Sequence, residues 1–283
     1  NGYQQGQAAV AKLRDLLETS PSVTELPDAQ PLPDIEGSIV FEDVNFAYVE
    51  DNPVLKNINF KIQIGETIAI VGPTGGGKST VAKLATRFYD PSSGRVLIDG
   101  YDIRNVQLES LRKQIGVVPQ EPFLFAGSIR QNVGFSRPEA SDDEIIEALD
   151  ASGLMPMVDS LPDGIDTVIH ERGASLSAGE RQLIAISRAF LSKPRVLVLD
   201  EATSNLDLQS ESQVERALDA ILDGRSAIIV AHRLATVMRA DRIIVVDNGR
   251  IVESGSHNEL LNKDGAYSEM HQQWKKTTQI YDS

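Results

Sequence analysis

The stretch Gly72-Pro-Thr-Gly-Gly-Gly-Lys-Ser79 joins a short apolar run, Thr67–Val71, to a helix-forming segment, Lys78–Phe88. It fits the pattern G-x-x-x-x-G-K-[ST] in the strand–loop–helix context that the pattern requires. Glycines let successive N–H groups converge on phosphate oxygens, and the helix N-terminus adds its positive dipole end. We expect Lys78 to reach the β- and γ-phosphates and the Ser79 hydroxyl to bind Mg²⁺. The predicted phosphate-binding residues are Gly72, Thr74, Gly75, Gly76, Gly77, Lys78, Ser79 and Thr80.

A second motif, Val196-Leu-Val-Leu-Asp-Glu201, is an apolar strand that ends in two carboxylates. Asp200 could hold Mg²⁺ directly or through water. Glu201 follows on the opposite side of the pleat and is placed to orient or deprotonate a water that attacks the γ-phosphate. Taken alone, such a pair could be a solvated strand end. Next to a phosphate-binding loop, it predicts the metal and catalytic groups of a nucleotide hydrolase.

The pattern along the chain predicts an α/β fold: a P-loop NTPase core with a mainly parallel sheet, an antiparallel β subdomain and an α-helical subdomain. Three nearly continuous apolar runs are typical of strands covered on both faces, namely Val196–Leu199, Ala227–Val230 and Ile243–Val246. The antiparallel part is predicted from Ile39–Tyr48, Ile58–Ile62 and the hairpin-like Arg95–Asp99. The helical part is predicted from Asp142–Leu149, Leu154–Ser160 and the long helix Ala178–Leu191.

The composition excludes several classes of protein. With 27 basic and 41 acidic residues among 283, the formal net charge is −14, which argues against a broad nucleic-acid-binding face. A local cluster of N–H donors, Lys and Mg²⁺ can still bind an anionic nucleotide. The absence of cysteine excludes disulfides and thiolate metal sites and favours a reducing compartment. No apolar run approaches the roughly 18–20 residues that cross a bilayer.

Between the two motifs lies Leu176-Ser-Ala-Gly-Glu-Arg-Gln182, which resembles the ABC signature, usually LSGGQ. Together with Ser204-Asn-Leu-Asp207 and His232 downstream, it identifies the chain as resembling the ABC ATPase family over residues 38–269. The resemblance implies a head-to-tail dimer around two MgATP, in which the phosphate loop of one subunit faces the signature of the other. Such a dimer could be a homodimer or a heterodimer.

The resemblance also implies roles for single residues. Ser177 and the N–H of Gly179 would contact the partner's ATP, and the α-helical subdomain would carry this signature; Ser177 is equally a plain helix N-cap. Tyr48 resembles the aromatic residue that stacks on adenine, although alone it could be an ordinary strand residue. Gln120 resembles the glutamine that reaches Mg²⁺ or water and responds to a membrane domain. His232 resembles the histidine that holds the γ-phosphate and the water.

Asp207 resembles the aspartate that couples the two sites across the dimer. The predicted catalytic residues are thus Glu201, His232 and Lys78, and the predicted metal ligands are Ser79, Gln120 and Asp200. The chain departs from the family pattern at three positions, Gly76, Ala178 and Glu180. The negative charge of Glu180 next to the phosphate contact could weaken or slow the sandwich.

Two features favour an exporter. Thr167–Gly173 partly resembles the X-loop of exporters, and the amphipathic helix Tyr3–Thr19 resembles the linker that leaves a last transmembrane helix. Because the chain opens with Asn1, it reads as a fragment. We expect a helix and Pro-rich tether over 1–37, an ATPase domain over 38–275 with its helical subdomain at about 121–192, and a polar tail over 276–283.

These features predict the ATPase of a half-transporter on the cytoplasmic face of the plasma (inner) membrane, with its transmembrane domain in the same full-length chain. The alternatives are the ATPase subunit of an importer or a non-transport ABC clamp.

Overall fold

A computed structural model of the chain describes residues 2–18, 21–170, 173, 175–200, 206 and 208–281. Two predicted site residues, Glu201 and Asp207, lie outside the described residues. The same holds for Glu171 and Arg172 of the predicted X-loop. Their roles therefore remain predictions.

The centre of the molecule is a six-stranded sheet in the order β12-β11-β3-β10-β9-β6. Its strands are β3 (Thr67–Val71), β6 (Ile115–Val118), β9 (Val196–Asp200), β10 (Ser226–Val230), β11 (Arg242–Asp247) and β12 (Arg250–Gly255). All the neighbouring pairs are parallel except β11 with β12, which is antiparallel. Every residue of β3 and β10 is buried, which explains why these strands have no polar alternation.

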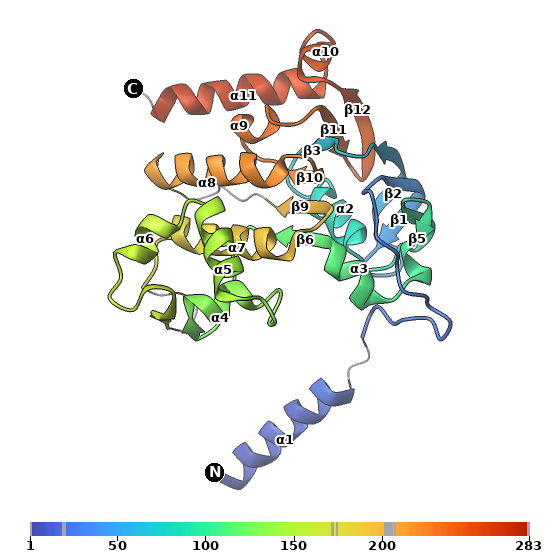
Figure 1. Cartoon of the computed structure of the whole chain (residues 1–283). Helices are drawn as coiled ribbons and strands as arrows, with labels where there is room; N and C mark the ends of the chain where they lie inside the picture. The colour runs from blue at the N-terminus through green and yellow to red at the C-terminus, as the bar shows by residue number, and fades with distance from the viewer. Residues whose placement is uncertain are drawn as a thin grey trace.

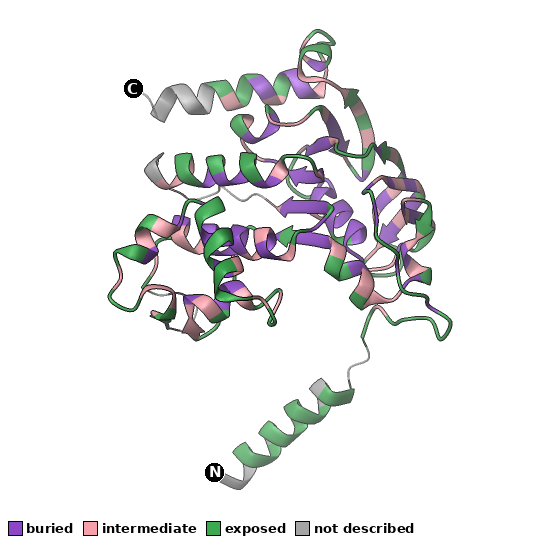
Figure 2. Ribbon diagram, viewed as in Figure 1, coloured by how far each residue is buried: buried purple, intermediate pink, exposed green. Residues whose placement is uncertain are grey.

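The two faces of this sheet pack into two separate cores because successive side chains point to opposite sides. Ile68 and Ile70 of β3 belong to the core shared with the antiparallel sheet. Ala69 and Val71 belong to the core shared with the helices that cover the other face. Figure 2 shows the central strands as the most completely buried part of the chain.

The antiparallel sheet has the order β2-β1-β4-β5. Its strands are β1 (Ile39–Ala47), β2 (Pro53–Ile62), β4 (Ser93–Ile98) and β5 (Tyr101–Asp102). The core that the two sheets share also contains residues of α2 (Lys78–Ala85), the short 3₁₀ helix η1 (Ile103–Asn105) and α3 (Leu108–Gln114). The rings of Phe41 and Phe60 stack in this sheet with their centroids 4.5 Å apart. The predicted antiparallel subdomain is therefore confirmed.

Helices form the rest of the molecule (Figure 1). The helical subdomain contains α4 (Ile129–Gly134), α5 (Asp142–Ala151), α6 (Met155–Asp159), the 3₁₀ helix η2 (Gly164–Asp166) and α7 (Ala178–Ser192), with a small ribbon of β7 (Gly127–Ser128) and β8 (Val168–Ile169). The sheet is further covered by α8 (Leu208–Leu222), α9 (Leu234–Val237), α10 (His257–Leu261) and α11 (Ala266–Tyr281). The predicted fold class, a P-loop NTPase core with two added subdomains, is confirmed.

The N-terminal region consists of a separate helix and a segment that packs on the core. Helix α1 (Gly2–Glu18) lies apart from the other elements in Figure 1, and its Val10 and Leu13 are 59% and 58% exposed. In contrast, Leu32 and Ile35 in the predicted tether are buried in the core. None of the described helices has both the length and the apolar character needed to cross a membrane.

The Asp99 carboxylate fixes the end of this segment. It accepts hydrogen bonds from the backbone N–H groups of Glu36, Gly37 and Ser38, the last at 2.7 Å. It also accepts one from the Ser38 hydroxyl at 2.9 Å. The segment expected to be a tether is therefore bound to the domain directly before β1.

Candidate functional site

The loop between β3 and α2 has a backbone that requires glycine at particular positions. Gly72 has a φ of 147°, and a Cβ added there would lie 2.0 Å from the carbonyl oxygen of Val246. Gly77, the N-cap of α2, has a φ of 106°. A Cβ at Gly76 would lie 2.9 Å from the Val246 oxygen, so this departure from the family pattern suits the close approach of β11. The loop thus presents bare backbone at the start of a helix, as an anion site requires.

Lys78 lies across this loop. Its side chain is only 5% exposed, and its ammonium donates hydrogen bonds of 3.0 Å to the carbonyl oxygens of Gly72 and Pro73. The positive charge is therefore held at the mouth of the loop, where phosphate oxygens are predicted to bind.

A cavity of about 580 Å³ opens over the loop. Ten residues predicted from the sequence line it: Tyr48, Thr74, Gly75, Gly77, Lys78, Ser79, Thr80, Gln120, Asp200 and His232. Val54 also lines it and was not predicted. The strand order explains this convergence, because β3, β6, β9 and β10 are parallel neighbours and their carboxyl ends meet at one edge.

Asp200 ends β9 directly beside Val230, the last residue of β10. His232 follows two positions later, which brings its ring to the same edge of the sheet. Burial raises the pKa of the Asp200 carboxyl above its ordinary value. The charges of His232 and Lys83 and a hydrogen bond from Ser79 oppose this shift without cancelling it. Asp200 is thus a partly desolvated carboxylate among cations.

The oxygen donors in this cavity suit a magnesium ion. The Ser79 hydroxyl already bonds to Asp200, and Gln120 adds an amide oxygen to the same cavity. Hydroxyl, carboxylate and amide oxygens are the ligands that Mg²⁺ prefers. Within the part of the chain that the structure describes, no cluster of three or more His, Asp and Glu side chains is placed to hold a metal. A Mg²⁺ ion bound to Ser79, Asp200 and Gln120 would take its remaining ligands from water and substrate phosphates, as Mg²⁺ commonly does.

Tyr48 stands at the rim of the cavity with 45% of its surface exposed. Its hydroxyl lies 3.2 Å from the Thr80 hydroxyl, and the ammonium of Lys83 lies 5.6 Å from the centre of its ring. The ring is also held edge-on against Tyr89, at 5.1 Å between centroids. Lys83 was not predicted as part of the site. It is one helical turn beyond Ser79, so its spacing on α2 is the signal that would have found it.

Ser177 and Gly179 do not line this cavity; they lie at the N-terminus of α7. Ser177 is the N-cap, and its hydroxyl accepts a hydrogen bond from the backbone of Glu180 at 3.2 Å. Gly179 is buried, and a Cβ added there would lie 2.5 Å from the Cβ of Ser210 in α8. Glycine at this position therefore also allows the close packing of α7 on α8.

An aromatic groove of about 610 Å³ borders the nucleotide cavity and shares Ser79 and Asp200 with it. Its exposed rings are Phe88, Phe123, Phe125 and Phe135. Arg188 of α7 lies against Phe125 and Phe135, about 6.0 and 5.9 Å from the ring centres. Burial lowers the pKa of this guanidinium to about 10. We call this surface the aromatic groove.

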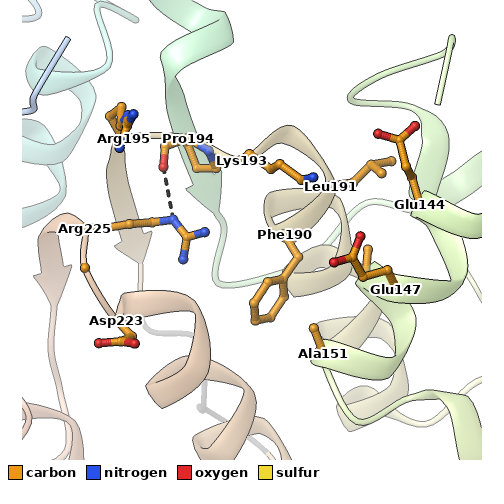
Figure 3. A pocket seen from close by; sticks show the side chains of 12 residues that line it. Glu144, Glu147, Ala151, Phe190, Leu191, Lys193, Pro194, Arg195, Asp223 and Arg225 are labelled. Atoms are coloured by element: carbon orange, nitrogen blue, oxygen red, sulfur yellow. Dashed lines mark hydrogen bonds between the residues drawn. The ribbon is translucent and has the colours of Figure 1, made fainter.

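Another cavity, of about 540 Å³, lies where α5, the end of α7 and the turn before β10 meet (Figure 3). Phe190 and Glu147 face it from one side and Arg225 from the other, with Arg225 Nε donating to the carbonyl oxygen of Pro194 at 3.1 Å. None of the residues predicted from the sequence lines it.

Comparison with known proteins agrees with this geometry. The family model described as "ABC transporter" matches residues 55–204. An uncharacterised ABC transporter ATP-binding protein of Bacillus subtilis is 44% identical over 270 residues, which is 95% of this chain and 47% of that protein. An ATP-dependent lipid A-core flippase of Syntrophus aciditrophicus is 45% identical over 272 residues, which is 96% of this chain and 45% of the flippase.

Among solved structures, a bacterial Atm1-family ABC exporter with ATP bound superposes with a TM-score of 0.86 at 41% identity. The match covers 95% of this chain and 47% of that one. The chain thus spans about half the length of the relatives that it matches.

Proposed function

The chain belongs to the ABC transporter family, and from that premise we propose that it is the ATP-hydrolysing part of an ABC exporter. The observation that carries the proposal is the single cavity that gathers the phosphate loop, Asp200, Gln120 and His232. A non-enzymatic nucleotide clamp would need the loop but not a carboxylate and a histidine at the same edge of the sheet.

Different residues of the cavity have different roles in the proposed hydrolysis. The backbone of the loop and Lys78 bind the β- and γ-phosphates and neutralise their charge. Ser79, Asp200 and Gln120 would hold Mg²⁺, which screens the phosphate oxygens when it is bound. His232, which lines the same cavity as Asp200, would hold the γ-phosphate and the attacking water. Glu201, the residue after Asp200, is the proposed base.

A second nucleotide-binding domain is the first proposed partner. Ser177 and Gly179 lie outside the chain's own nucleotide cavity. This supports a head-to-tail dimer in which the signature of each subunit meets the ATP of the other. We leave open whether that partner is a second copy or a homologue.

A transmembrane domain in the same full-length chain is the second proposed partner. The chain is about half the length of its relatives, one of which is a lipid A-core flippase and another an ABC exporter. The aromatic groove supports docking of such a domain, because exposed rings of this number mark an interaction surface. The domain would then work at the cytoplasmic face of the membrane.

The test is MgATP hydrolysis by the chain and by Glu201→Gln, together with molar mass from light scattering in ATP. We expect hydrolysis to be lost in the variant and an ATP-dependent dimer to accumulate. Glu139→Gln is the control, since Glu139 is 74% exposed and lies in the helical subdomain. An unmodified chain that binds ATP but neither dimerises nor hydrolyses it would contradict the proposal.

A further inference from the structure

The signature helix α7 begins with a reciprocal pair of hydrogen bonds between Ser177 and Glu180. The backbone N–H of Glu180 donates to the Ser177 hydroxyl oxygen at 3.2 Å. The backbone N–H of Ser177 donates to the Glu180 carboxylate at 2.7 Å. This is a capping box, in which each residue satisfies the other's helix-end group.

The pair also determines which way the Ser177 hydroxyl can act. A serine hydroxyl has one hydrogen to donate and two lone pairs that accept. Since a lone pair of Ser177 is taken by the Glu180 N–H, the hydrogen is turned away from the helix end. Ser177 itself is exposed, so this hydrogen is presented to solvent at the positive end of the α7 dipole.

The rest of the α7 N-terminus is held by the fold. The Arg181 guanidinium bonds to the carbonyl oxygen of Leu176, directly before the cap. Gly179 packs closely on Ser210 of α8. The backbone N–H of Glu180 restrains the Ser177 side chain, and the Glu180 carboxylate restrains the Ser177 backbone from which that side chain projects.

We propose that Glu180 is a positioning residue: its carboxylate fixes the backbone of Ser177, so that the Ser177 hydroxyl is presented as an oriented donor for the γ-phosphate of the ATP bound by the partner subunit. This inference rests on the proposed function. A donor fixed in advance loses less conformational entropy when the dimer closes. Glu180 therefore supports the sandwich through geometry, in contrast to the weakening that its charge alone predicts.

The same chain offers matched comparisons. An identical Ser-x-x-Glu capping box starts α10, where Ser256 pairs with Glu259. At α4 the box is formed by Ser128 and Gln131, with the Ser128 N–H donating to the glutamine oxygen at 2.9 Å. Glutamine thus makes the same hydrogen bond without the charge, so Glu180→Gln keeps the positioning and Glu180→Ala removes it.

The experiment compares the 283-residue chain with Glu180→Ala, Glu180→Gln and Glu259→Ala. Three quantities are measured: the melting temperature, the affinity of the monomer for ATP at low protein concentration, and the MgATP concentration that gives half-maximal dimerisation. For Glu180→Ala we expect this last concentration to rise on the order of five-fold, as for the loss of one hydrogen bond. Monomer affinity should stay unchanged.

Glu180→Gln should restore dimerisation to within about two-fold of the unmodified chain, the size of a weak charge effect. Glu259→Ala should lower the melting temperature as much as Glu180→Ala does while leaving dimerisation unchanged. If Glu180→Ala dimerises like the unmodified chain, or if Glu180→Gln fails to restore dimerisation, the positioning role is wrong and the proposed function stands. If the unmodified chain binds ATP but never dimerises, the proposed function fails and this inference fails with it.

Discussion

The side-chain amide of Gln182 in α7 donates a hydrogen bond of 3.3 Å to the carbonyl oxygen of Pro119, the residue before Gln120. The same helix reaches this segment again beyond Gln120, where Arg188 donates to the carbonyl oxygen of Phe123 at 2.7 Å. The helix that opens with Ser177 is thus bonded to both sides of the loop that brings Gln120 to the nucleotide cavity.

Replacing Gln182 should disturb that loop. Gln182 is 2% exposed, so Gln182→Leu leaves the Pro119 oxygen without its donor and should cost about 1–3 kcal/mol of unfolding free energy. We also expect the turnover number for MgATP hydrolysis to fall several-fold, because Gln120 loses its fixed position. Urea unfolding and steady-state kinetics measure the two effects.

The matched control is Gln114→Leu. Gln114 donates to the carbonyl oxygen of Pro33 at 2.9 Å and accepts from the N–H of Ile35 at 2.8 Å, away from the nucleotide cavity. It should lose comparable stability and keep its turnover number. If the turnover number of Gln182→Leu is unchanged, the hydrogen bond from α7 does not position Gln120 for hydrolysis.

Lys78→Met should weaken nucleotide binding strongly. The ammonium is buried over the loop and is the strongest charge available to the β- and γ-phosphates, so we expect ATP affinity to fall by about ten-fold or more. Calorimetric titration with MgATP measures this. Lys113→Met is the control, because Lys113 is 72% exposed and pairs with Glu109 on α3. If the two variants bind MgATP with equal affinity, Lys78 does not contribute to the nucleotide site.

Asp200→Asn should make the nucleotide-free chain more stable while destroying its activity. The raised pKa of Asp200, caused by burial, means that the folded chain favours the protonated carboxyl. The contribution of the Asp200 carboxyl to the unfolding free energy is thus present below its ordinary pKa and is lost as pH rises through its pKa in the folded chain. Asparagine cannot ionise, so Asp200→Asn does not lose stability as pH rises through this range. At pH 7.5 in EDTA its unfolding free energy should exceed that of the unmodified chain by on the order of 0.5 kcal/mol, a small value because solvent screens the site.

Hydrolysis by Asp200→Asn should be undetectable at all Mg²⁺ concentrations, because the metal loses its carboxylate ligand. Guanidinium unfolding at pH 3.5 and 7.5 gives the stability difference. A variant that is less stable than the unmodified chain at pH 7.5 would show that the ionised carboxylate supports the fold.

Asp99 should show the opposite pH dependence. Burial raises the pKa of its carboxyl, but the N–H groups of Gly37, Glu36 and Ser38 outweigh burial and lower the pKa overall. Its contribution is therefore present above its ordinary pKa and lost as pH falls through the folded value. We expect Asp99→Ala to cost about 1–3 kcal/mol at neutral pH and to reduce the acid-induced loss of stability.

The matching structural readout for Asp99 is limited proteolysis of the segment 21–37, which should be cut faster in Asp99→Ala. Asp99 has a φ of 48°, which asparagine tolerates, so Asp99→Asn separates loss of charge from loss of backbone fit. If both variants resist protease like the unmodified chain, the buried Leu32 and Ile35 and the hydrogen bonds to Gln114 hold the segment without Asp99.

Local patterns predicted the phosphate loop and most of the strands well. The bounds of β3 match the predicted Thr67–Val71, because the glycine-rich loop after this apolar run marks the end of the strand in the sequence itself. In contrast, β6 was not predicted. Its burial depends on distant packing, since a Cβ at Gly116 would lie 2.7 Å from Pro194. The edge strand β12 has no fully buried residue, so hydrophobicity gives little signal there.

In the site too, features set by local sequence spacing could be predicted, and contacts between distant parts of the chain could not. The glycines and Lys78 were identifiable because their spacing is local, and Tyr48, Gln120 and His232 only because they match a family pattern. The contact of Gly179 with Ser210 and the capture of residues 36–38 by Asp99 join distant parts of the chain, and no sequence spacing encodes them. Glu201 and Asp207, outside the described residues, remain predictions.

The shared wall of the aromatic groove and the nucleotide cavity has a pharmacological consequence. Ser79 and Asp200 face both spaces. A hydrophobic inhibitor seated among Phe88, Phe123 and Phe135 would reach Ser79 and Asp200, the proposed metal ligands, from the groove and not through the nucleotide cavity. Its contacts with the three rings lie outside the nucleotide cavity, so ATP would compete with it only at this shared wall.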